Sequence, residues 1–213
     1  MENKIYSKIY LWLFIGLLIT FITGAYIASN ENLLLMIFSN KIHFILALIE
    51  LGLAIFLSAR IHKMKPTTAK IIYILYTILS GLTFASIFII YELQSIILVF
   101  LVTSILFLIF AIIGHFTKID LSKIGTYLFM VLIGIIICTI VNMFLKNSTF
   151  DIIITSISII VFLGFISYDI QKIKRLHGYL PEDNLAIIGA FELYLDFINI
   201  FIDLLRLFGK SDD

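Results

Sequence analysis

The feature that most constrains this chain is a series of long apolar stretches. A helix rises 1.5 Å per residue, so about 20 apolar residues cross a hydrocarbon core that is ~30 Å thick. Seven stretches approach that length, and they cover residues 9–28, 42–59, 71–91, 95–114, 124–145, 152–168 and 185–207. Because lipid offers no partner to backbone N–H and C=O groups, each stretch is predicted to be helical. The sequence therefore predicts an all-α protein, a seven-transmembrane helix bundle forming a single integral membrane domain over residues 1–213.

Composition supports a membrane location and excludes several other classes. The chain is 62% hydrophobic and only 14% charged, and water cannot cover so much apolar side chain. A formal net charge of +1 gives no basic field for nucleic acid. The one cysteine, Cys138, excludes an intrachain disulfide, and the four histidines lack metal-ligand spacing. We expect no resident cofactor and no nucleic-acid partner.

The basic residues predict the orientation of the chain. Loops rich in Lys and Arg stay on the cytoplasmic side. Eleven of the fifteen basic residues fall on the side of the N-terminus: Lys4, Lys8, Arg60, Lys63, Lys65, Lys70, Lys118, Lys123, Lys172, Lys174 and Arg175. The other side holds Lys41 and Lys146, with Arg206 and Lys210 if the last helix crosses completely. The N-terminus is predicted to be cytoplasmic and the C-terminus outside, whereas a re-entrant last helix would return the C-terminus to the cytoplasm.

The last predicted span carries a polar stripe. Glu192, Asp196, Asn199, Asp203 and Arg206 step by 4, 3, 4 and 3 residues, which places them on one helix face. Three acids near the middle of the span cost about 2.5–3.5 kcal/mol each. Thirteen Leu, Ile and Phe residues between Leu185 and Leu205 gain ~0.3–0.6 kcal/mol each, so the two sums roughly cancel. We therefore predict that this helix is central, with its stripe turned inward. Pro181 and the polar residues after it mark where the helix starts.

The members of the stripe allow different interpretations. Asp203 and Arg206 lie three residues apart and are predicted to form a local structural ion pair. Asp196 has no basic residue one turn away on its own helix, which favours a functional role. Glu192, Asn199 and Asp203 are candidates for an ion path, the alternative being a sealed hydrogen-bond network.

Three polar residues of the other helices are also candidates. Glu50 is the one carboxylate inside the first six predicted spans, and it either lines an ion path or is a protonated acid bonded to a backbone carbonyl. Asp169 follows the sixth span and is either a site residue or an interfacial acid neutralised by Lys172 or Lys174. Arg60 ends the second span at the same depth, so it either pairs with Asp169 or anchors the helix at the interface.

Several segments of the chain match a known family signature. The strongest matches are Tyr168-Asp-Ile-Gln-Lys-Ile173, Ala186-Ile-Ile-Gly-Ala190, Leu193-Tyr-Leu-Asp-Phe-Ile-Asn-Ile-Phe201 and Leu205-Arg-Leu-Phe-Gly209. Ser80-Gly-Leu-Thr83 and Lys118-Ile-Asp-Leu-Ser122 agree as well. With these segments the chain resembles the Bax inhibitor (transmembrane Bax-inhibitor motif) family, and most closely its bacterial, YetJ-like calcium-leak branch. One departure is Ser86, where the family often has a proline, so a proline kink is not expected in the third span.

The resemblance implies a function and assigns residues to it. It implies seven helices with the last one central, and a calcium leak gated by pH through two aspartates. By motif these are Asp169 and Asp196, which would also be transient Ca²⁺ ligands, and Arg60 is implied as a latch on the first of them. Calcium ions and protons are then the partners, together with the lipid bilayer, and a bacterial plasma membrane is the expected location.

Other functions remain open from the sequence. A proton-coupled calcium exchanger would use the same acids, and a regulatory protein that binds an unknown membrane partner is a further alternative. An intramembrane aspartyl protease is disfavoured because Leu193, Tyr194 and Leu195 precede Asp196, where such enzymes use Gly-x-Gly. We expect no enzymatic activity.

Overall fold

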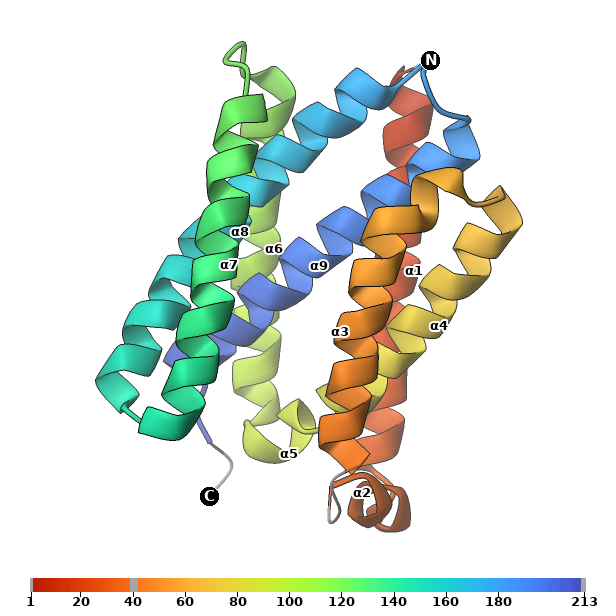
Figure 1. Cartoon of the computed structure of the whole chain (residues 1–213). Helices are drawn as coiled ribbons and strands as arrows, with labels where there is room; N and C mark the ends of the chain where they lie inside the picture. Colours follow the sequence, from red (N-terminus) through yellow and green to blue (C-terminus); the bar gives the residue numbers. More distant parts are fainter. Residues whose placement is uncertain (1, 39–41, 212–213) are drawn as a thin grey trace. The chain divides into compact units, whose positions relative to one another are not determined.

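The computed structural model describes residues 2–38 and 42–211, and Lys41 of the charge count lies outside these ranges. The described chain is helical, with two isolated β-bridges and no strand (Figure 1). Its helices are α1 (Glu2–Ala28), α2 (Glu31–Phe38), α3 (Ile42–Arg60), the 3₁₀ helix η1 (Ile61–Lys63), α4 (Pro66–Phe84), α5 (Ile87–Ile90), α6 (Leu93–Phe116), α7 (Ser122–Leu145), α8 (Ser148–Leu176) and α9 (Glu182–Phe208). The predicted all-α class is confirmed.

Six helical segments of the described residues are long and apolar enough to cross a membrane. They are Lys4–Ala28, Pro66–Ile90, Leu93–Phe116, Ser122–Leu145, Ser148–Leu176 and Glu182–Phe208. Six of the seven predicted spans are thereby matched. The remaining one, residues 42–59, coincides with the 19-residue helix α3, and its crossing stays a prediction.

The helices differ from the predicted spans at their ends. The span predicted over 152–168 lies inside α8, which continues to Leu176 through polar residues. Hydropathy marks where a helix leaves the hydrocarbon, not where the helix ends. The last turns of α8 are polar, so the apolar pattern does not show that the helix continues through them. The start predicted at Pro181 is confirmed, because α9 begins at Glu182.

The span predicted over 71–91 is interrupted although it has no proline. α4 ends at Phe84 and α5 begins at Ile87, with Ala85 and Ser86 between them. The Ser86 hydroxyl donates to the Thr83 carbonyl at 3.0 Å, and the Ser86 amide contacts the same oxygen at 3.4 Å. A hydroxyl that bonds a carbonyl of the preceding turn competes with the helical ladder, which accounts for a break at this point.

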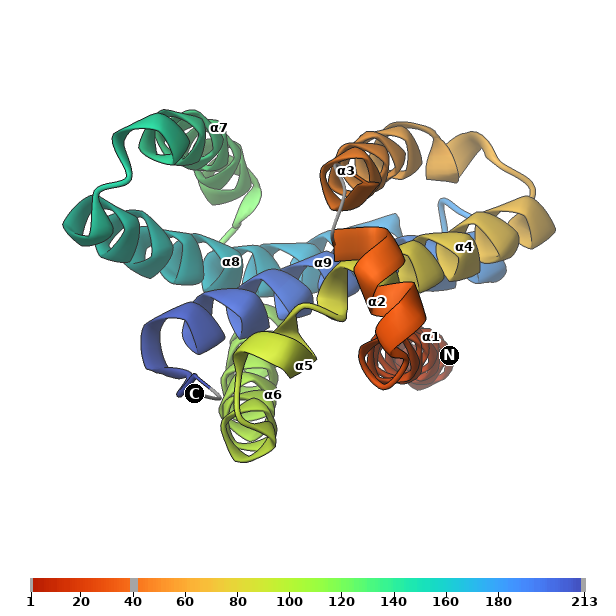
Figure 2. The same cartoon turned by 90° about the horizontal axis from the view of Figure 1, so that it is seen from below.

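The chain divides into two compact units. The first contains residues 1–93, 176–194 and 211–213, and therefore α1 to α5 and the first half of α9. Within it α1 packs along α4, and α2 lies across the end of α1 (Figure 2). Ile27, Ile37 and Ala85 form a small buried cluster where α1, α2 and the α4–α5 break meet.

Aromatic side chains fill the centre of this first unit. Tyr73 and Tyr76 of α4 meet Phe191 and Tyr194 of α9 edge to face, with ring centroids 5.2–6.5 Å apart. The Tyr194 hydroxyl lies 2.6 Å from the hydroxyl of Thr20, which also contacts the Thr77 carbonyl at 3.0 Å. These hydrogen bonds satisfy polar groups that the apolar surroundings would otherwise leave costly.

The second unit contains residues 94–175 and 195–210, which hold α6, α7, α8 and the second half of α9. Phe197 of α9 packs against Phe100 and Phe107 of α6. The helices differ widely in burial, since 78% of the most apolar window of α9 is buried but only 6% of that of α7. α9 is the most buried of the six candidate spans.

Candidate functional site

The polar stripe lies on α9, the most buried of the six candidate spans among the described residues. Asp196 is 4% exposed and Asp203 is 9% exposed, whereas Glu192 and Asn199 are partly buried. Arg206 closes the stripe with an exposed side chain. Carboxylates in a membrane helix are tolerated where protein covers them, and this burial is what a stripe turned away from lipid requires.

The last turns of the stripe make identified contacts. The Asn199 amide donates to the Leu195 carbonyl of its own helix at 2.7 Å. Arg206 lies 3.8 Å from Asp151, which is in the first turn of α8. Arg206 therefore links α9 to α8 within the second unit, and the pair predicted between Asp203 and Arg206 stays a prediction.

The two aspartates singled out by the family motif both belong to the second unit. Asp169 of α8 is 7% exposed and Asp196 of α9 is 4% exposed. Ile166 and Ile173 of α8 share a helix face with Asp169 and are buried as well. That the two carboxyls share a proton stays a prediction. Arg60, the predicted latch, is the last residue of α3 in the first unit and has an exposed side chain.

Glu50 has a hydrogen-bond partner that the sequence did not indicate. Its Oε2 lies 2.7 Å from the hydroxyl of Thr83, so α3 is joined to α4 within the first unit. The Thr83 hydroxyl also lies 2.9 Å from the Ser80 carbonyl. The only signal for this contact was the family segment Ser80-Gly-Leu-Thr83, to which no role had been assigned.

A cluster of ion pairs holds the start of α9 in the first unit. Asp183 lies 3.3 Å from Lys8 of α1 and 3.0 Å from Lys70 of α4, and Glu182 lies 3.1 Å from Lys8. The Asn184 amide donates to the Met64 carbonyl at 2.8 Å. Lys8 and Lys70 had been predicted only as cytoplasmic charges, because sequence does not reveal which acid a distant lysine meets.

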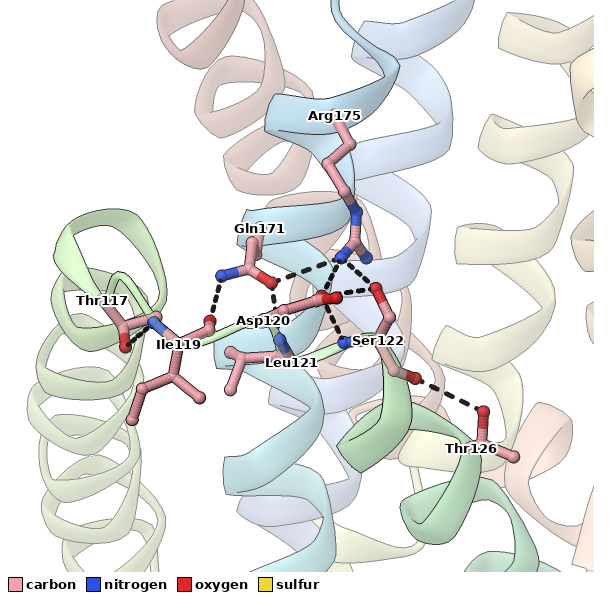
Figure 3. A network of polar contacts seen from close by, with 8 residues as sticks. All are labelled: Thr117, Ile119, Asp120, Leu121, Ser122, Thr126, Gln171 and Arg175. Carbon is pink, nitrogen blue, oxygen red and sulfur yellow. Dashed lines mark hydrogen bonds and ion pairs between the residues drawn. The ribbon is translucent and has the colours of Figure 1, made fainter.

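A second polar network fastens α8 within the second unit (Figure 3). Gln171 donates to the Ile119 carbonyl and accepts from the Leu121 amide, both at 2.8 Å. Arg175, one turn further, pairs with Asp120 at 3.0 Å and contacts the Ser122 hydroxyl. The network joins the connection between α6 and α7 to the end of α8.

The carboxyl of Asp120 is stabilised in its ionised form by this network. Its Oδ1 accepts from the Ser122 hydroxyl at 2.6 Å and from the Ser122 amide at 2.9 Å. These hydrogen bonds, followed by the charges of Arg175 and Lys123, lower the pKa of Asp120 from its ordinary value. Asp-Leu-Ser ahead of a helix is a recognisable turn sequence, but its partners on α8 lie fifty residues away and carry no local signal.

No group of three or more His, Cys, Asp or Glu side chains is placed to hold a metal ion among the residues that the structure describes. Asp169 and Asp196 are expected to bind Ca²⁺ only briefly as it passes, and this stays a prediction.

Helices of this length and apolarity, with acids buried on the last of them, define an integral membrane protein of the all-helical class. The family model described as Inhibitor of apoptosis-promoting Bax1 matches residues 2–213. The chain belongs to this Bax inhibitor family, so the resemblance read from its motifs is confirmed.

Bacterial relatives match nearly the whole chain. Inner membrane protein YbhL of Escherichia coli K12 is 40% identical over 211 residues, which cover 96% of this chain and 90% of the relative. An uncharacterized protein of Borreliella burgdorferi is 37% identical over 215 residues, with 98% and 93% covered. An uncharacterized membrane protein of Streptococcus pyogenes serotype M1 is 34% identical over 216 residues, with 99% and 94% covered.

Proposed function

We propose that this protein is a pH-sensitive calcium leak channel of a bacterial plasma membrane. The observation that carries the proposal is the burial of two family-motif aspartates, Asp169 and Asp196, in one unit of a membrane protein. Ionised carboxyls are expensive to bury in a span, so buried acids of this kind mark proton or cation pathways. Membership of the Bax inhibitor family supports the same function.

The proposed topology has seven spans, with the N-terminus in the cytoplasm and α9 at the centre. α3 then crosses as the second span, since its 19 residues reach about 28 Å at 1.5 Å each. The excess of basic residues on one set of connections supports the orientation. The name of YbhL, an inner membrane protein, supports the location.

The gate that we propose is a proton-sharing pair. Two carboxyls within hydrogen-bond distance in a poorly hydrated core cannot both ionise cheaply, so they titrate together. Arg60 acts as the latch, because its charge favours ionised Asp169 and holds the second span against the sixth. Protonation weakens this attraction, and acidification thereby opens the path.

Calcium then moves passively down its gradient. Carboxylate and carbonyl oxygens are suitable ligands for this hard cation, and weak, successive sites allow it to leave again. Asp169 and Asp196 serve as transient ligands, while Glu50, Glu192, Asn199 and Asp203 are the further candidates along the path. The proposal includes no catalytic step and no cofactor.

The test is calcium flux into liposomes that contain only the purified protein, measured across a pH series. The parent is expected to conduct more as the pH falls, and Asp169→Asn and Asp196→Asn are expected to lose this pH dependence. Glu31→Gln, at an exposed acid of α2, is the matched control and keeps the parent profile. An aspartate variant that retains the parent profile refutes the gate.

The same liposomes separate the alternatives. A proton-coupled exchanger drives calcium against its own gradient when a pH gradient is imposed, whereas a leak does not. A regulatory protein that acts only by binding a membrane partner gives no flux at any pH when it is alone in the bilayer.

A further inference from the structure

The end of α8 has two distinct faces. Successive residues of a helix are turned by about 100°, so Ser167, Tyr168, Gln171 and Arg175 fall within one arc of about 100°. Asp169 lies on roughly the opposite side with the buried Ile166 and Ile173, and the buried Ile170 lies between the two faces. The first group is called the fastening face below, because each of its members contacts α6, α7 or the connection between them.

Two contacts on the fastening face bring backbones close together. The Ser167 hydroxyl donates to the Phe110 carbonyl of α6 at 2.7 Å. One turn further along α6, a Cβ on Gly114 would lie 2.6 Å from the Cα of Ser167. Only glycine leaves room for this approach, since a neighbouring backbone atom cannot move aside as a flexible side chain can.

Tyr168 packs in a similar way against α7. A Cβ on Gly125 would lie 2.6 Å from the Cζ atom of the Tyr168 ring. The guanidinium carbon of Arg175 lies 5.8 Å from the centroid of the same ring, at cation–π distance. The ring is thus held between the start of α7 and the last turn of α8.

Gln171 and Arg175 complete the attachment through the α6–α7 connection (Figure 3). Gln171 uses both ends of its amide on backbone groups of that connection, each at 2.8 Å. Arg175 adds the ion pair with Asp120 at 3.0 Å. A glutamine bound by donor and acceptor at once fixes the rotation of its helix as well as its distance.

When one face of a rigid helix is held in place, the direction in which the side chains of the opposite face point is fixed as well. A carboxyl lies about 5 Å from the helix axis, so a rotation of about 20° moves it by about 2 Å, which is most of a hydrogen-bond length. We propose that Gln171 and Arg175 are positioning residues, and that the α6–α7 connection sets the rotation of α8 that aims Asp169. The consequence for gating rests on the proposed function, but the positioning does not.

Other charged residues lie near this end of α8, and they affect which substitutions can test the proposal. Lys118, Asp120 and Lys123 come from the α6–α7 connection and the start of α7, and Lys172 and Lys174 follow Asp169 on α8 itself. Removing a charge therefore has a direct electrostatic effect besides any rotation. Gln171→Leu removes no charge. It removes three hydrogen bonds of a neutral side chain, with the Ile119 carbonyl, the Leu121 amide and the Arg175 guanidinium, and keeps its approximate size.

The experiment measures the protonation of Asp169 directly. Infrared spectra of the full chain in lipid are recorded across a pH series, and the carboxylic C=O band of Asp169 is identified by its loss in Asp169→Asn. Gln171→Leu is expected to move the titration midpoint of this band by about 0.5 pH unit or more. Hydrogen exchange of residues 165–176 is expected to become faster in the same variant.

Two further variants guard against misfolding and against a simple charge effect. Lys174→Gln removes an exposed charge from the same turn as Arg175 and is expected to leave the exchange rate unchanged. Arg175→Asp is expected to loosen the end of α8, and the reciprocal double variant Asp120→Arg/Arg175→Asp is expected to restore slow exchange. This rescue also keeps the test valid if Gln171→Leu fails to fold.

The results of these measurements are separable. Faster exchange without any movement of the Asp169 band overturns the positioning role while leaving the channel proposal intact. Exchange that is unchanged in both Gln171→Leu and Arg175→Asp overturns the fastening itself. A moved band in a protein that conducts no calcium upholds the positioning and refutes the proposed function.

Discussion

Thr83 has one hydroxyl proton and two neighbouring acceptors. Its oxygen lies 2.7 Å from Glu50 Oε2 and 2.9 Å from the Ser80 carbonyl. If Glu50 is ionised, both neighbours compete for the same proton, whereas a protonated Glu50 donates to Thr83 and leaves its hydroxyl free to serve Ser80. In either state this hydrogen bond joins the carboxyl to α4.

Thr83→Val keeps the shape of the side chain and removes this contact. We expect the free energy of unfolding to fall by about 1–3 kcal/mol, because the partly buried Glu50 carboxyl loses this hydrogen bond. Thermal unfolding in lipid nanodiscs measures the change. Thr126→Val on α7 is the matched control, since Thr126 is exposed and its hydroxyl donates to the Ser122 carbonyl of its own helix. Equal losses in the two variants contradict the prediction.

The hydrogen bonds from Ser122 and the charge of Arg175 can be ranked by how much each lowers the pKa of Asp120. The pKa of its carboxyl is lowered first by the hydrogen bonds from Ser122 and then by the charge of Arg175. A ¹³C NMR titration of aspartate carboxyls should place its midpoint below the ordinary value of about 3.9. Ser122→Ala is expected to raise this midpoint more than Arg175→Ala does, and the reverse order contradicts the assignment of causes.

The sign of the pH effect follows from the lowered pKa. A carboxyl whose pKa is lower in the folded state contributes stability above its unfolded pKa, and this contribution is lost as the pH falls through the folded value. The attachment of the α6–α7 connection to Asp120 should therefore persist under mild acidification and weaken only below about pH 4. Gating at mildly acidic pH has to come from other groups.

At the scale of single residues, the sequence predicted which polar residues are buried better than it predicted which residues they contact. The burial of Asp196 follows from the free-energy cost of facing lipid, which depends on composition and spacing alone. The contact of Arg206 with Asp151 does not, because Asp151 comes from another helix. Contacts between distant segments depend on the angle and depth at which helices cross, and local spacing contains neither.

Between elements, α1 and α4 approach each other closely at Gly81. A Cβ on Gly81 would lie 2.5 Å from the Thr23 Cβ and 2.9 Å from the Thr20 carbonyl oxygen. Transmembrane helices associate closely where such residues let their backbones approach. The Ser-Gly-Leu-Thr segment therefore serves packing on one side and the Glu50 contact on the other.

Gly81→Ala is expected to destabilise the protein by about 1–3 kcal/mol, because the added methyl group forces α1 away from α4. Gly52→Ala on α3 is the control, since no atom of another described segment lies within 4 Å of the added Cβ. Thermal unfolding in nanodiscs compares the two variants. A Gly52→Ala protein that loses as much stability as Gly81→Ala shows that helix packing is not the cause.

The sequence predicted the end of a helix where the helix stops together with its apolar residues. It missed the end where the helix continues into polar residues. α8 runs through Asp169, Gln171 and Arg175, and these polar turns carry the fastening face. The break at Ala85 and Ser86 was missed for a different reason. A missing proline gave no cause for a kink, whereas a serine hydroxyl that bonds a carbonyl of the preceding turn is common inside regular helices too.

At the scale of the whole molecule, the helical class and the family could be predicted because both rest on features spread over the entire chain. Apolar length alone requires helices in lipid, and the motif segments extend from Ser80 to Gly209. Of the predicted site residues, Asp169, Asp196 and Asp203 are buried, and the roles assigned to them stay predictions. Its internal geometry could not be predicted, since it depends on how helices from distant parts of the chain meet.

The proposed orientation is open to a direct measurement. The variants Lys118→Cys and Lys146→Cys, each in a Cys138→Ser background, are exposed to a membrane-impermeant thiol reagent in intact cells. Lys118 belongs to the connections rich in basic residues and Lys146 to the opposite set, so Lys146→Cys is expected to react from outside and Lys118→Cys only after the cells are opened. Reaction of Lys118→Cys in intact cells would reverse the assignment of sides.

The contrast in burial between α7 and α9 also bears on how the sequence can drift over generations. Only 6% of the most apolar window of α7 is buried in protein, so most of its side chains face lipid, which accommodates any apolar side chain of similar size. Exchanges among Leu, Ile, Val and Phe should therefore accumulate there almost freely. α9, with 78% covered, has neighbours to fit at nearly every position, and its residues should change slowly.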